Sequence, residues 1–354
     1  MKVSGVLSEA ARNVSTGTTK AVTWALATTV ILTLLTLADV VTIMRIERDV
    51  QTFQATAANV HKAPAPNQID GFGCDALAGV STIKASGAIR ERSTITIDQA
   101  PLVPMTAYDV TYGFGRVIGI DNLDVPGVWV EAGLAQLLAV SPGATLSTKD
   151  GPLQVAGVYD WPNDGRDIRF SYAILVPVVA AQPFDECWIQ AWPIIDDNDK
   201  LLRSTQIVTS EAYPILIAQV NRNYGVTMDA NRLYSERITW HTIWVAPLFL
   251  GLFGFLATWR RRLEYSAALH ARQARGAFML GVAIETAVWA LTGAGLTSMI
   301  DLVVIRLIGL REIWLVWLGG VIIIWCSLVA GLVGGVCASA LIREKGLFRF
   351  FKTR

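Results

Sequence analysis

The sequence is short of charge and of histidine for a chain of 354 residues. Charged residues make up 17% of it and hydrophobic residues 53%, which is too apolar for an ordinary soluble protein. The three histidines, His61, His241 and His270, are far apart, and neither H-E-x-x-H nor C-x-x-C occurs. The sequence therefore predicts no metal site.

Several other catalytic and binding signatures are also missing. The chain has no G-x-S-x-G nucleophile motif and no G-x-x-x-x-G-K-[ST] loop, so it does not bind ATP through a P-loop of its own. We expect no catalytic residue and no cofactor. The basic stripe that is typical of nucleic-acid binding is missing too, and no nucleic-acid partner is expected.

Four long apolar runs dominate what is present. They occupy residues 21–44, 240–259, 276–300 and 313–341. Each supplies the roughly 20 apolar residues that a helix needs to cross about 30 Å of hydrocarbon. Because a backbone in lipid must satisfy its hydrogen bonds internally, all four are predicted to be transmembrane helices.

The charges predict how these helices are oriented. Residues 46–239 contain 22 acidic and 14 basic residues, whereas the remainder contains 7 acidic and 16 basic residues. Basic residues cluster in 1–20, 260–275 and 342–354, which the positive-inside rule places in the cytoplasm. We expect a multi-pass plasma-membrane protein with cytoplasmic termini, an extracytoplasmic domain over 45–239 and a short, charge-balanced outer loop over 301–312. The 1–20 segment has the pattern of an amphipathic helix on the membrane surface.

The extracytoplasmic domain is predicted to be mixed α/β. Spacings of three and four extend the first helix as a stalk to Val60, and the Pro-containing segment 62–67 ends it. Residues 229–239 are expected to form a second stalk, and further helices are expected over 130–140 and 204–224. Short β-type runs are 80–89, 93–97, 110–120, 172–178 and 187–192, with a hairpin over 144–159.

The four cysteines fall in two environments. Cys326 and Cys337 lie in the fourth apolar run, where single cysteines act as small packing residues. Cys74 and Cys187 lie in the exported domain, where the compartment permits disulfides. We expect them to pair, and the alternative is two buried thiols.

A few polar and small residues inside the apolar runs stand out. Glu285 lies well inside the third run, and Asp39 lies near the outer end of the first. An intramembrane carboxylate is costly, so Glu285 is either a coupling or pathway residue or a structural carboxylate bonded to a neighbouring helix. Small residues recur at four-residue spacing and predict close helix packing, within one subunit or between two copies; they are Ala25 and Thr29 in the first run and Ser327, Gly331 and Gly335 in the fourth.

The basic segment after the second run resembles the MacB/FtsX-type permeases of ABC systems. The resemblance lies in a run of arginines, a Glu, an aromatic residue and an Ala-Leu segment, followed by a Glu in the third span; here these are residues 260–272 and Glu285. Residues 128–146 and 153–159 are similar to the family's outer-domain helix and strand. His270 departs from the family's usual Gly, and the tail lacks its usual ending.

The resemblance implies a non-catalytic subunit that works with a cytoplasmic ABC ATPase and a second permease subunit, identical or different. It implies that the segment 260–275 couples to the ATPase through Arg260, Arg261, Arg262, Glu264, Tyr265, Leu269, His270 and Arg272. The leading hypothesis is an export or mechanotransmission permease that acts on a peptide-like or amphipathic substrate. The alternative is an FtsX-like anchor that binds and activates an extracytoplasmic hydrolase or lipoprotein, and a membrane sensor without an ATPase is a third.

Overall fold

The chain consists of two compact units. The computed structural model describes residues 3–120, 123–208, 215–225, 228–310 and 312–344. Met1–Glu47 and Asn231–Arg354 form one unit, here called the membrane unit, and Arg48–Ala230 form the other, here called the sheet unit. Part of the predicted cytoplasmic tail, residues 345–354, lies outside the described residues.

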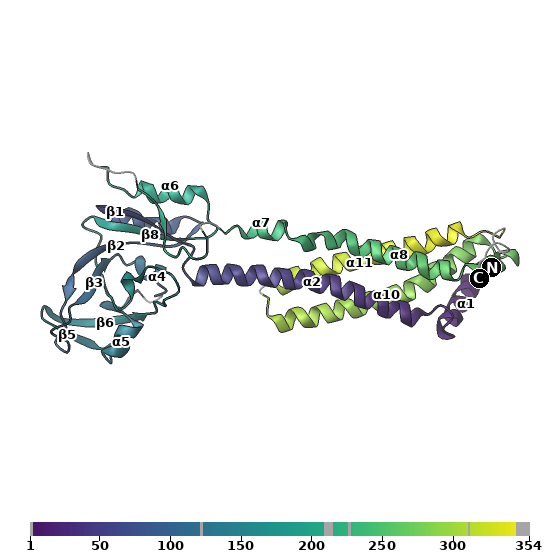
Figure 1. Cartoon of the computed structure of the whole chain (residues 1–354), viewed down its shortest axis with the longest axis horizontal. Helices are drawn as coiled ribbons and strands as arrows, with labels where there is room; N and C mark the ends of the chain where they lie inside the picture. Colours follow the sequence, from purple (N-terminus) through teal and green to yellow (C-terminus); the bar gives the residue numbers. More distant parts are fainter. Residues whose placement is uncertain (1–2, 121–122, 209–214, 226–227, 311, 345–354) are drawn as a thin grey trace. The chain divides into compact units, whose positions relative to one another are not determined.

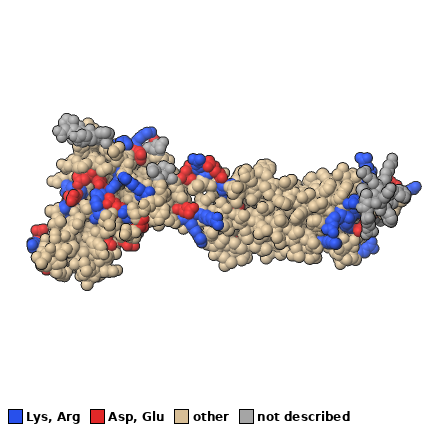
Figure 2. Space-filling view, viewed as in Figure 1, with Lys and Arg blue, Asp and Glu red and all other residues tan. Residues whose placement is uncertain are grey.

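Among the described residues, four helices are long and apolar enough to cross a membrane. They are α2 (Ala21–Ala55), the segment Ala230–Arg260 that ends in α8 (Thr242–Arg260), α10 (Arg275–Ile308) and α11 (Ile313–Leu341). Figure 1 shows α8, α10 and α11 running side by side. The visible face of these helices in Figure 2 is a band of uncharged residues, with charged side chains gathered at its two ends. The predicted fold class, four membrane helices and a mixed α/β domain after the first, is confirmed.

Short helices connect and flank the spans. The amphipathic α1 (Val3–Ser15) packs on α10 through its buried Val6 and Ala10. The expected second stalk over 229–239 is not one helix, because α7 (Ala230–Ser235) ends before a separate 3₁₀ turn at Ile238–His241. The helix α9 (Arg262–His270) lies between α8 and α10.

The third span extends beyond its predicted end. The helix α10 runs to Ile308, where Gly309 closes it in the left-handed conformation that suits glycine. Asp301 was therefore wrongly assigned to an outer loop, since it lies inside this helix with 2% of its surface exposed. The charged residue Arg306 suggested a loop, but it lies in α10, where it and Leu307 are exposed on the outer side of the helix.

The small-residue stripes mediate packing within the subunit. A Cβ on Gly254 of α8 would overlap the carbonyl oxygen of Gly331, and one on Gly335 would come within 2.9 Å of Thr286 Oγ1 on α10. On α2, Ala25 is buried, and Thr29 Oγ1 donates to its carbonyl oxygen at 2.9 Å. The fourth-span stripe, with Ser327 fully buried, therefore lets α8 and α10 approach α11 closely.

The sheet unit is built around a nine-stranded sheet with the order β5-β6-β4-β7-β3-β2-β8-β1-β9. Its strands are β1 (Val60–Ile69), β2 (Ile83–Ile95), β3 (Met105–Val110), β4 (Val128–Glu131), β5 (Thr145–Thr148), β6 (Gly151–Tyr159), β7 (Ile174–Pro177), β8 (Phe184–Ala191) and β9 (Ala218–Gln219). Aromatic rings fill the core; Phe170 lies 5.3 Å from Trp188, edge to face. The short helices α3 (Gly71–Ala76), α4 (Phe114–Val117), α5 (Ala132–Leu137) and α6 (Asp196–Ser204) cover the strands.

Several local predictions for this unit are wrong. Residues 62–67 do not end a stalk but lie in β1, which tolerates its prolines because pairing with β8 is interrupted between Pro64 and Ile69. The predicted strand over 110–120 contains α4, which begins after Gly113. The helix predicted over 130–140 is present in part: α5 covers Ala132–Leu137, and Glu131 caps it by accepting from Leu134 N, whereas the buried residues 128–131 form β4.

The helix predicted over 204–224 is also wrong. Helix α6 ends at Ser204, and the short strand β9 follows at Ala218–Gln219. Residues 209–214, including Pro214, lie outside the described residues. Gln219 hydrogen-bonds the backbone carbonyls of Ala58 and Gly225 and so holds this segment beside β1.

The predicted disulfide is confirmed. Cys74 in α3 and Cys187 in β8 are bonded, with their Cα atoms 5.8 Å apart. Both are fully buried. The bridge closes a loop of 113 residues, which in the chain-entropy model stabilises the folded domain by about 4–5 kcal/mol.

The contact between α8 and α11 predicts a specific sensitivity. A Cβ on Gly334 would overlap the backbone carbonyl of Gly251, so Gly334→Ala should destabilise the membrane unit by about 1–3 kcal/mol. The matched control is Gly319→Ala on the same helix, where nothing lies within 4 Å. Thermal unfolding of both variants in detergent checks this, and equal midpoints would contradict the close approach.

Candidate functional site

The candidate site lies where the predicted coupling segment meets α10. Helix α8 ends at Arg260, the chain turns at Arg261, and α9 begins at Arg262. Helix α1 also packs on α10. These elements bring together residues that are far apart in the sequence.

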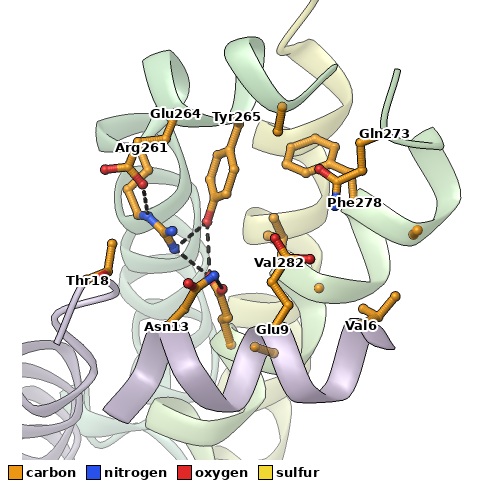
Figure 3. Close-up of a pocket in the computed structure, with 15 residues that line it drawn as sticks. Val6, Glu9, Asn13, Thr18, Arg261, Glu264, Tyr265, Gln273, Phe278 and Val282 are labelled. Atoms are coloured by element: carbon orange, nitrogen blue, oxygen red, sulfur yellow. Dashed lines mark hydrogen bonds and ion pairs between the residues drawn. The ribbon is translucent and has the colours of Figure 1, made fainter. Parts of the chain in front are cut away.

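Glu285 is the centre of this site. It accepts hydrogen bonds from Arg261 Nη1 at 2.6 Å, Tyr265 Oη at 3.0 Å and Asn13 Nδ2 at 2.8 Å. Figure 3 shows Arg261, Tyr265 and Asn13 converging from the α8–α9 turn, α9 and α1. The side chains of Arg261 and Glu285 are only 13% and 9% exposed, so they form a buried ion pair. We call Asn13, Arg261, Tyr265 and Glu285 the Glu285 cluster.

The surroundings fix the protonation of the cluster's donors. Burial, together with the Glu285 carboxylate, raises the pKa of the Tyr265 phenol, so Tyr265 remains a hydrogen-bond donor at neutral pH. Burial alone would lower the pKa of Arg261, but Tyr265, Glu285 and Glu264 together raise it above the ordinary value. Arg261 therefore stays charged, and its Nε also pairs with the exposed Glu264 at 2.8 Å.

A cavity of about 220 Å³ adjoins the cluster. Its walls come from α1, α9 and α10 and combine apolar and polar side chains, among them Val6, Glu9, Gln273, Phe278 and Val282. Asn13, Arg261, Tyr265 and Glu285 all line this cavity, so the cluster lies at its wall.

The other predicted coupling residues divide between surface and core. Leu269 is buried against Phe278, Val282 and Ile342. Four residues lie at or near the surface: Arg260 and Arg272 are exposed, Arg262 lies over the Trp259 ring at 5.8 Å, and His270 Nδ1 lies 3.2 Å from Glu344. The segment therefore offers an exposed basic surface whose inner side is fixed to α10.

Asp39 occupies a separate place in the membrane unit. It forms an ion pair with Arg237 Nε at 2.7 Å, and the two side chains are 14% and 8% exposed. The Arg237 guanidinium also lies 4.0 Å from the Tyr234 ring centroid. The structure does not bring Asp39 to the Glu285 cluster.

Two residues of note were missed by the sequence analysis. Asn13 carries its signal in spacing, because it follows Val6 and Ala10 on the buried stripe of α1, where a polar side chain needs a partner. The burial of Asp301 was not predicted, because the charged residues that follow it suggested an outer loop. Its Oδ1 accepts from Thr36 Oγ1 at 3.0 Å.

Comparison with known proteins gives structural similarities only. No family profile matches the chain, and no curated protein matches it. A crystal structure of the periplasmic region of MacB from Actinobacillus actinomycetemcomitans aligns with 12% identity and a TM-score of 0.35, covering 49% of this chain and 94% of that one.

Two other solved structures align over similar shares. One is a domain described as part of a permease protein from Porphyromonas gingivalis, with 10% identity and a TM-score of 0.33, covering 51% of this chain and 98% of that one. The other is the extracellular domain of the noncanonic ABC-type transporter YknZ from Gram-positive bacteria, with 14% identity and a TM-score of 0.28, covering 44% and 98%.

The two glutamates that pair with Arg261 should differ in how much stability their substitution costs. Glu285→Gln leaves the buried guanidinium without its buried counter-charge, so we expect a loss of about 3 kcal/mol in unfolding free energy. Glu264, which is 55% exposed, pairs with the same arginine, and Glu264→Gln should cost less than about 1 kcal/mol. Unfolding in detergent measures both, and similar losses would show that the buried pair has no special weight.

Proposed function

We propose that this chain is the permease subunit of an ABC-type export or mechanotransmission system. A separate cytoplasmic ATPase supplies the energy, and ATP hydrolysis moves the extracytoplasmic domain, which acts on a peptide-like or amphipathic substrate. The termini and α9 then face the cytoplasm, and a second permease subunit, identical or different, completes the assembly.

The observation that carries this proposal is the connection between α9 and α10. A coupling element needs a surface for its partner and a firm link to a membrane helix. The segment from Arg260 to Arg272 has an exposed basic side, and Arg261 links its inner side to Glu285. Because breaking a buried ion pair is costly, displacement of α9 is expected to move α10 with it.

The course of α2 and the order of the elements also support the proposal. The sheet unit is inserted between the first and second spans, as in the resemblance to MacB/FtsX-type permeases. Helix α2 is continuous from Ala21 to Ala55, beyond the length of a span. It therefore provides an unbroken helical connection out of the membrane.

A surface of the sheet unit favours the alternative of a regulatory anchor. A groove of about 400 Å³ lies across β2, β3 and β8, lined by charged and aromatic residues that include Arg90, Tyr108, Arg169 and Glu186. A groove lined by charged side chains can accept a polar protein segment, so it fits an extracytoplasmic partner as well as a substrate.

Copurification tests the proposed function. The tagged full-length chain, purified in mild detergent from its native host, should bring with it a P-loop ATPase whose activity is measurable. Arg272→Glu, on the exposed coupling surface, should reduce the amount recovered by at least about tenfold, the equivalent of losing roughly 1.4 kcal/mol of binding.

The matched control for this experiment is Arg306→Glu. Arg306 is also exposed but lies near the other end of α10. Recovery should be unchanged in this variant. If no nucleotide-binding protein copurifies, or if both variants behave alike, the coupling role is wrong.

A further inference from the structure

Among the described residues of the membrane unit, Asp301 on α10 is an acid whose buried side chain has a partner on one oxygen and none on the other. Its side chain is buried, and Oδ1 accepts a hydrogen bond from Thr36 Oγ1 on α2. The other oxygen, Oδ2, is buried without any hydrogen-bond partner among the described residues. Buried carboxylate oxygens are normally paired, so this one calls for a ligand or a proton.

A very small cavity lies beside this oxygen. It measures about 10 Å³ and is lined by Thr36, Asp39, Asp301, Trp317, Gly320 and apolar neighbours. Gly320 on α11 leaves the space open, since a Cβ there would lie 3.6 Å from Asp301 Oδ2. The cavity is close to the smallest volume that holds one water molecule.

The surrounding charges do not compensate an ionised Asp301. Asp39 is the other charged residue lining the cavity, and its negative charge is matched by Arg237 at 2.7 Å. Arg306, on the same helix, is exposed. Trp317 Nε1 donates to the Ser298 carbonyl, so it is not directed at Asp301. An ionised Asp301 would therefore have no counter-charge among the described residues that line this cavity.

We propose that Asp301 is an intramembrane proton-binding site. An O–H bond forms at Oδ2 when the carboxylate takes up one proton, and the neutral acid keeps its hydrogen bond from Thr36. No other reactant is needed, and no bond breaks apart from the one that held the incoming proton. This site goes beyond ATP-driven coupling and does not depend on it.

A proton fits the site better than a metal ion. The described lining side chains offer oxygen atoms only from Asp301, Thr36 and Asp39, and a cavity of about 10 Å³ has no room for the waters that would complete the roughly six-oxygen shell of Mg²⁺ or Ca²⁺. A single positive charge is enough to balance the group. Loss of the proton places a charge between α2, α10 and α11 and draws water into their contact, so proton occupancy controls how tightly α2 packs on α10.

Infrared spectroscopy of the full-length protein in lipid nanodiscs tests this site. At mildly acidic pH the wild type should show a carbonyl stretch of a protonated carboxylic acid that fades as the pH rises through neutrality, and Asp301→Asn should lack it. Asn keeps the shape of the neutral acid, so this variant should fold. The matched control is Asp49→Asn, an exposed acid on α2, which should keep the band.

Thermal unfolding adds a second readout. The wild-type midpoint should fall by roughly 2 °C or more as pH rises from acidic to alkaline, because the folded state holds a proton that the unfolded state releases. Asp301→Asn should lose this part of the dependence. Gly320→Ala fills the cavity but leaves room for a proton, so it should keep the infrared band.

Three results would overturn the proposal. The first is a carboxylic-acid band that is missing in the wild type or unchanged in Asp301→Asn. The second is loss of the band in Gly320→Ala, which would mean that the cavity content is larger than a proton. The third is wild-type stability that responds to Na⁺ at fixed pH and no longer does so in Asp301→Asn, which would assign the site to Na⁺.

Discussion

A carboxylate inside a helix bundle must find partners, and Glu285 finds them outside its own helix. Its three donors come from α1, from the turn at Arg261 and from α9. Each donor is polar and itself partly buried. Removing one therefore leaves Glu285 with fewer hydrogen bonds, and the free energy of unfolding falls by the cost of that unmet desolvation. The need to pair this one buried carboxylate thus connects the N-terminal helix, the basic segment and the third span by hydrogen bonds. The proposed coupling role depends on these bonds.

In the described part of the membrane unit, Glu285, Asp39 and Asp301 differ in the partners that they have. Glu285 is paired with a cation and receives two further hydrogen bonds, whereas Asp39 is paired with Arg237, whose guanidinium also contacts aromatic rings. Asp301 accepts a single hydrogen bond, from the hydroxyl of Thr36. An arginine guanidinium lies within 3 Å of each of the first two carboxyl groups. The third, without one, is suited to binding a proton rather than to fixing an element in place.

The sequence predicted those features that depend on composition over long windows. Four apolar runs specify four helices, because lipid allows few other structures. The Cys74–Cys187 bridge was predictable because the exported domain contains these two cysteines and lies in a compartment that permits disulfides. Glu285 was recognised because a lone acid in an apolar run is costly, but the sequence left open whether it serves structure or coupling. Its hydrogen bonds to α1 and to the α8–α9 segment show that it is bonded to neighbouring helices, and the coupling role is a proposal that rests on the same bonds.

The failures share a physical cause, which is that tertiary pairing overrode local pattern. Residues 60–69 contain two prolines yet form β1, because β8 pairs with Val60–Pro64 and again with Ile69, and the interruption between them accommodates Pro66. Residues 204–224 were predicted to be helical, but Gln219 donates to the carbonyl of Ala58, which is far away in the sequence, and to that of Gly225 nearby. Asp301 looked like a loop residue because flanking charges said nothing of the helix continuing to Ile308. The partners that decided these cases lie far away in the sequence.

The mechanical link between α9 and α10 is tested most directly by a double-mutant cycle on Arg261 and Glu285. Unfolding free energies of the wild type, Arg261→Gln, Glu285→Gln and the double variant are compared in the same detergent. If the buried pair connects the two helices, the losses are non-additive, with an interaction energy of about 1–3 kcal/mol. Losses that add to within about 0.5 kcal/mol would contradict the link.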